Sequence, residues 1–179
     1  DLLIEGNRIR SVTPGGAAMN ARVRLRVRDL PRGWTLASDL LYPNLTLERA
    51  WSSVIVGGDF RILRDPDSNV QLAIRGAWSF SDQQLLAQAS DIIAGHRRFW
   101  NDPASPYLVT VLQLTGPEGW LSVGGTGLDD AFAFFATPNA EQNTIIRTLA
   151  HESFHTWISP QVGGLPQEDQ PLQYWLSEG

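Results

Sequence analysis

The sequence predicts an α+β protein in which most strands precede the long helices. Between residues 21 and 78, short runs of apolar and β-branched residues are separated by glycine, proline and asparagine turns. After residue 78, two apolar patterns with a period near 3.6 residues predict long helices, with strands between them. We therefore expect a partial, β-sandwich-like N-terminal domain over 1–78, followed by a second domain over 79–179.

The composition bears on partners and cofactors. The chain has 179 residues and a formal net charge of −5, which gives no indication of a nucleic-acid or anionic-membrane partner. It has no cysteine, so disulfides, thiolate metal ligands and a cysteine nucleophile are excluded. No run of about 18 apolar residues is present, and we expect no membrane span. The sequence begins in the middle of a strand-like pattern and stops directly after a helical-looking aromatic stretch, so we expect these residues to be part of a longer protein.

The strands of the first domain are predicted from alternation. Residues 21–28 alternate between aliphatic residues and arginines, which is the period of a half-buried strand. We interpret the arginines as the solvated face of that strand, and an anion-binding stripe is the alternative. Further short strands are predicted at 54–56, 60–63 and 70–74.

The first long helix is predicted over 82–100. Ser81 and Gln84 have the spacing of a capping box, and apolar residues follow at helical intervals. His96 lies in this helix beside two arginines, and we predict a surface residue there rather than a metal ligand.

Strands and a second long helix are predicted after this. Asn139 is a predicted N-cap of that helix, whose apolar residues recur through Trp157. The glycine-rich residues 124–127 join the last two predicted strands. The three strands are 107–115, 120–123 and 131–136.

The second long helix carries the pattern H-E-x-x-H, from His151 to His155. Side chains four residues apart lie on one helical face, so both imidazoles can bind one Zn²⁺. Glu152 then lies beside the metal, where it can take a proton from zinc-bound water. The pattern is short, and a helix that happens to carry two exposed histidines is the alternative.

A catalytic zinc site needs a third protein ligand besides the two histidines. Glu178 is the candidate, because in one group of zinc peptidases a second helix packs on the first and delivers a Glu from such a place, and residues 158–170 are predicted to be the connecting loop. On spacing alone, an ordinary surface carboxylate at Glu178 is an equal alternative.

Two segments resemble the glycyl aminopeptidase family of gluzincin zinc peptidases. Residues 151–157 have the pattern H-E-x-x-H-T-W, and residues 175–179 have an aromatic-x-x-Glu-Gly pattern. Residues 30–34 also resemble a Leu-Pro-x-Gly-Trp turn in the N-terminal domain of that family. The resemblance implies that residues 79–179 are the N-terminal half of a thermolysin-like zinc peptidase domain.

The resemblance also implies roles for single residues. His151, His155 and Glu178 are then the zinc ligands, and Glu152 is the general base. The glycine-rich segment becomes an edge strand that holds the substrate backbone, and a plain glycine turn is the alternative. The implied substrate-binding residues are Gly124, Gly125, Asp129 and Asp130.

The implied function is zinc-dependent hydrolysis of peptide bonds, as an aminopeptidase that prefers small N-terminal residues. The resemblance favours a periplasmic or secreted location. Gluzincins draw a transition-state-stabilising Tyr or His from later helices, so we expect little peptidase activity from these 179 residues alone. The alternatives are a non-catalytic peptide-binding module on the same fold and another zinc hydrolase on a different scaffold.

Overall fold

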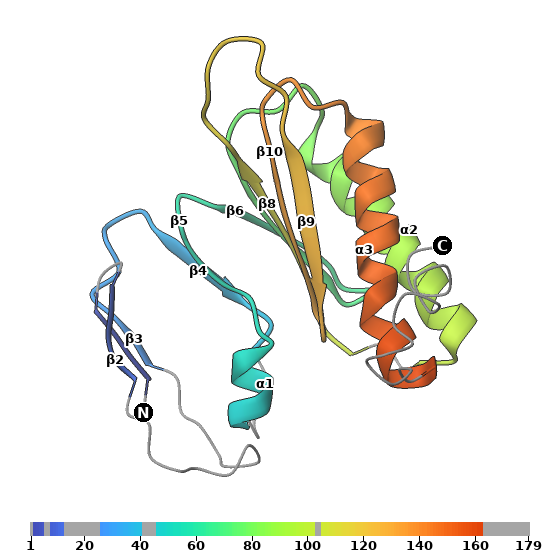
Figure 1. Ribbon diagram of the computed structural model, residues 1–179, viewed down its shortest axis with the longest axis horizontal. Coiled ribbons are helices and arrows are strands. Elements are labelled where there is room, and N and C mark those ends of the chain that lie inside the picture. The colour runs from blue at the N-terminus through green and yellow to red at the C-terminus, as the bar shows by residue number, and fades with distance from the viewer. Residues whose placement is uncertain (1, 6–7, 13–25, 41–45, 103–104, 163–179) are drawn as a thin grey trace, which may run out of the picture.

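The structure is a computed structural model that describes residues 2–5, 8–12, 26–40, 46–102 and 105–162 (Figure 1). These residues form sheets and helices, in agreement with the predicted α+β class. None of the helices in this part of the chain has the length and apolarity needed to cross a bilayer.

The first part of the chain forms two small sheets and a short helix (Figure 1). One sheet has three strands in the order β2-β1-β3, and the other pairs β4 with β5. The elements are β1 (Leu2–Glu5), β2 (Arg8–Val12), β3 (Arg26–Arg28), β4 (Thr35–Ser38), α1 (Leu47–Trp51) and β5 (Ile55–Gly58).

A five-stranded sheet forms the centre of the rest of the chain. Its order is β6-β7-β8-β10-β9. The three inner strands are parallel, whereas β6 and β9 run antiparallel at the two edges. The strands are β6 (Arg61–Asp65), β7 (Val70–Arg75), β8 (Tyr107–Gln113), β9 (Val123–Leu128) and β10 (Ala131–Ala136).

Two long helices, α2 (Asp82–Trp100) and α3 (Gln142–Val162), cover one face of this sheet (Figure 1). The main apolar core lies between them and the sheet, because alternate residues of the inner strands point to the same side. Its largest fully buried side chains include Tyr107, Phe132 and Phe134. A smaller cluster on the other face packs residues 37, 54 and 60 against the sheet.

The sheet crosses the domain boundary that we expected at residue 78. Strand β7 pairs in parallel with β8, and β6 pairs with β7. Residues 61–75 therefore belong to the same sheet as the strands after residue 100, and they pack against α2. The sequence missed this because parallel pairing joins segments that are separated by a whole helix.

Several predicted elements agree with the structure and three do not. The loop expected over 158–170 does not begin at residue 158, because α3 continues to Val162, and the rest of that stretch lies outside the described residues. The helix at 82–100 has the predicted capping box, with both of its hydrogen bonds. The strand expected at 120–123 instead begins at Val123 and runs through the glycines. The second long helix begins at Gln142 rather than after Asn139, because the chain first makes a turn in which the Ala140 amide bonds to the Thr137 carbonyl at 3.0 Å.

Arg97 connects three segments of the chain through hydrogen bonds. Its side chain is 6% exposed, and it donates hydrogen bonds to the carbonyl oxygens of Ser68 and Ser105. These carbonyls lie in the β6–β7 turn and in the segment before β8, so one guanidinium holds α2 to both.

We expect Arg97→Met to lower the free energy of unfolding by about 2 kcal/mol, because two carbonyls lose a charged donor. Urea denaturation monitored by circular dichroism measures this. The control is Arg98→Met, at an exposed neighbour, which should change stability by less than about 0.5 kcal/mol. Equal losses in the two variants would contradict the assigned role.

Candidate metal centre

Helix α3 presents the two histidines of the H-E-x-x-H pattern side by side. The ring centres of His151 and His155 are 5.1 Å apart, and the ring planes are 85° to each other. Two imidazoles bound to one tetrahedral Zn²⁺ at about 2.0–2.1 Å have ring centres about 5 Å apart. The observed spacing therefore fits the binding of one ion by both side chains. His151 is exposed and His155 is half-buried, so the pair is accessible from solvent.

Glu152 is half-buried on the same turn of α3. In the part of the chain that the structure describes, no three His, Asp or Glu residues gather into a group that could hold a metal ion. Glu178, the predicted third ligand, lies outside the described residues. The described residues thus bring together two of the three predicted ligands, and they place the predicted base on the same helix.

The glycine-rich segment is an edge strand, and the alternative of a plain glycine turn is wrong. Strand β9 contains Gly124, Gly125 and Gly127 and pairs along its whole length with β10. It occupies the edge of the five-stranded sheet and runs beside α3 (Figure 1). Among the described residues, no further strand pairs with its outer side.

Close packing explains why this strand is rich in glycine. A Cβ atom at Gly127 would lie 2.1 Å from the carbonyl oxygen of Glu152. A Cβ atom at Gly125 would lie 2.7 Å from the ring of Phe132. Because real Cβ atoms are not found at such distances, any other residue at position 127 would push α3 away from β9. The glycines therefore let the turn of α3 that carries Glu152 and His155 lie directly against the edge strand.

The two residues that follow the motif hold α3 in this position. Thr156 donates a hydrogen bond of 2.8 Å to the carbonyl oxygen of Leu128, and its hydroxyl lies 3.1 Å from that of Tyr107. The Trp157 indole donates to Asp102 at 2.7 Å and stacks on Tyr107 with ring centres 5.9 Å apart. The T-W part of the motif thus anchors the helix to β8, β9 and the end of α2.

His96 is half-buried between α2 and α3, which differs from the surface position that we predicted. Its Nδ1 lies 3.3 Å from the hydroxyl of Ser153, and its ring contacts Phe154 and Trp157 edge-on. Burial lowers the pKa of His96. Because Ser153 lies two positions from His151, about 200° around the helix, His96 faces the side of α3 away from the histidine pair. The sequence contained one signal of this contact, because Ser153 is a polar residue within the apolar stripe of the helix.

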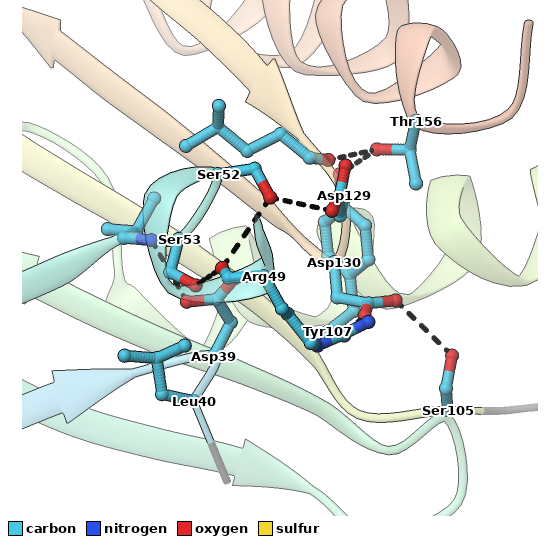
Figure 2. A network of polar contacts seen from close by, with 12 residues as sticks. Asp39, Leu40, Arg49, Ser52, Ser53, Ser105, Tyr107, Asp129, Asp130 and Thr156 are labelled. Carbon is cyan, nitrogen blue, oxygen red and sulfur yellow. Dashed lines mark hydrogen bonds and ion pairs between the residues drawn. The ribbon is translucent and has the colours of Figure 1, made fainter. Parts of the chain in front are cut away.

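Asp129 and Asp130 form the turn between β9 and β10, and both contact the first part of the chain (Figure 2). Ser52 donates to Asp129 at 2.7 Å. Asp130 forms an ion pair with Arg49 and lies 3.5 Å from the Ser105 hydroxyl. The turn therefore anchors α1 to the end of the edge strand, a role that the sequence did not indicate.

A buried carboxyl group lies behind this junction. Asp39 is 4% exposed and accepts a hydrogen bond of 2.9 Å from the Val54 amide (Figure 2). Burial raises the pKa of Asp39, while the Val54 amide and the charge of Arg49 act in the opposite direction.

Comparison with known proteins identifies the fold. No family model matches the chain, and no curated protein matches it either. Among solved structures, the chain is similar to an aminopeptidase N family protein from Idiomarina loihiensis, with a TM-score of 0.53 and 16% identity. The match covers 69% of this chain and 24% of that protein, so the chain spans about a quarter of its length. This likeness establishes a shared fold.

We expect Gly127→Ala to lower the free energy of unfolding by about 2–3 kcal/mol, because the added methyl group overlaps the Glu152 carbonyl. Chemical denaturation measures the change. Gly57→Ala is a matched strand control, since its nearest neighbours are 3.9 Å away, and it should cost less than about 0.5 kcal/mol. If both variants were equally stable, the close approach of α3 to β9 would not hold in solution.

The buried Asp39 predicts a specific pH dependence. Because the pKa of Asp39 is raised on folding, the native state keeps this proton to a higher pH than the unfolded state does. The stability that the protonated carboxyl contributes is therefore lost as the pH rises above about 4 through the raised pKa. The stability of Asp39→Asn relative to the parent should therefore increase between pH 4 and pH 7, as measured by thermal unfolding.

Asp59→Asn provides a control of opposite sign. A hydrogen bond from Arg75 lowers the pKa of Asp59, so its carboxylate contributes stability that is present above pH 4 and is lost on acidification. This variant should lose stability relative to the parent as pH rises. Parallel pH profiles for the two variants would contradict the assignment of burial as the cause at Asp39.

Proposed function

We propose that the protein to which these residues belong hydrolyses peptide bonds with a zinc ion held by His151, His155 and Glu178. The observation that carries this proposal is the spacing of the two imidazoles on α3, which fits one zinc ion. It is supported by the similarity of the fold to an aminopeptidase N family protein. The H-E-x-x-H sequence supplies the residue types that zinc hydrolysis needs.

The residues of the site divide the chemistry between them. When bound, the zinc ion would polarise the scissile carbonyl and activate water. Glu152 would take the proton from the attacking water and pass it to the leaving amine. Glu152 lies between the two histidines in the sequence, and its backbone packs against Gly127 of the edge strand. Both features support this role.

The edge of β9 is the proposed binding surface for the substrate backbone. An extended peptide can pair with an edge strand through main-chain hydrogen bonds. Gly124 and Gly125 lie on this strand, and their lack of side chains leaves the backbone open to a close approach. The same edge would serve a non-catalytic peptide-binding module, which is the second candidate function.

We further propose an aminopeptidase specificity, with small residues at the N-terminus of the substrate. Asp129 is the better of the two candidate receptors for a free α-amino group, since it is exposed and its hydrogen-bond donor is a neutral hydroxyl. Asp130 is paired with Arg49, whose charge competes with that of an incoming amine.

In the full-length protein, Glu152→Gln should keep zinc and lower kcat by roughly 10²–10⁴-fold, because the base is lost and the ligands are not. Zinc content and hydrolysis of glycyl and alanyl peptide amides measure the two effects. Full activity of this variant would refute the assignment of the base. Zinc binding and peptide binding without hydrolysis in the parent would favour the non-catalytic module.

Glu178→Ala tests the third ligand. We expect about one zinc ion per chain in the parent, as in a three-ligand catalytic site, and a lower content in this variant. Elemental analysis after gel filtration measures it. Equal zinc in both proteins would mean that another residue is the ligand.

A further inference from the structure

We propose that Thr156 is a positioning residue of the candidate zinc site, because its hydroxyl fixes the helical turn that carries His155 against the end of β9. This inference rests on the proposed function of that site. It assigns a task to a side chain that neither binds metal nor reacts with substrate.

The direction of the hydrogen bonds around Thr156 follows from its donor capacity. A hydroxyl group has one hydrogen. Because the carbonyl oxygen of Leu128 can only accept, the 2.8 Å bond between them uses the hydrogen of Thr156. The Tyr107 hydroxyl, at 3.1 Å, must then donate to Thr156. The hydrogen bonds therefore run in one direction, with Tyr107 donating to Thr156 and Thr156 donating to Leu128.

The donor at the start of this chain is held rigidly. Tyr107 is 2% exposed, and its ring stacks on Trp157, whose indole is itself bonded to Asp102. Burial raises the pKa of Tyr107, so it keeps its proton throughout the neutral range. Thr156 consequently has a fixed partner on the side of the core and delivers its own hydrogen to the edge strand.

The acceptor at the end of the chain lies next to the tightest contact of the site. Leu128 directly follows Gly127, whose Cα lies against the backbone of Glu152. Glu152 and Thr156 are four residues apart, so they lie on one face of α3 and contact consecutive residues of β9. Two contacts on one face fix both the rotation of the helix and its position along the strand. The direction in which the two histidines point relative to the edge of β9 depends on both.

An ordinary structural anchor would also contain these hydrogen bonds, and the two roles make different predictions. An anchor contributes to stability alone. A positioning residue changes zinc affinity beyond what its effect on stability explains, because outer-shell groups orient the ligands. The test therefore compares variants that each remove a hydrogen bond of Thr156. Only one of these variants removes the bond to the carbonyl oxygen of Leu128.

The experiment compares Thr156→Val, Thr156→Ser and Tyr107→Phe in the full-length protein. Zinc affinity is measured by competition with a chromogenic chelator, and the unfolding temperature is measured on the zinc-free form. Thr156→Val should weaken zinc binding by about 10–100-fold. Thr156→Ser keeps the hydroxyl and should stay within about threefold of the parent. Tyr107→Phe should lower the unfolding temperature yet also stay within about threefold.

Each outcome is decisive. Parent-like zinc affinity in Thr156→Val, or an equal loss in Tyr107→Phe, would overturn the positioning role while leaving the proposed zinc site intact. If the parent binds no zinc, the proposed function fails and this inference fails with it. If Thr156→Val does not fold, Thr156→Ala is compared with Thr156→Ser, and equal affinities in that pair would likewise overturn the inference.

Discussion

The contact between the backbone of Gly127 and the backbone of Glu152 is the constraint on which the arrangement of the site depends. It brings a helix and an edge strand closer than any side chain at position 127 would permit. The carbonyl of the next residue is then within reach of Thr156. As a result, His151 and His155, whose ring centres are 5.1 Å apart, lie beside a strand whose outer edge pairs with nothing in the described residues.

Support for this contact comes from both sides of the sheet. On one side, the main core and the stacked pair Tyr107–Trp157 hold α3 against the inner strands. On the other side, Arg49 and Ser52 hold the turn at the end of β9 through Asp130 and Asp129. The edge strand is thus fixed at its C-terminal end by the first part of the chain and along its length by β10.

Local patterns predicted local features well. The capping box at Ser81 and the placement of His151 and His155 side by side on a helix each depend on residues within one or two helical turns, and spacing alone predicted both. The membership of β6 and β7 in the main sheet depends on pairing across α2, which no local pattern encodes. For the same reason, the sequence did not reveal the partners of Asp130 or the contact of His96 with Ser153.

The three glycines of β9 also affect how the protein moves. Glycine loses more conformational freedom on ordering than any other residue, and it adds no side chain to the core. A strand with this composition depends on its neighbours for order, so it should open before the buried inner strands when the native state fluctuates. Such local opening would loosen the rim beside the histidine pair while the buried inner strands stay folded, which makes the site more pliable than the sheet that supports it.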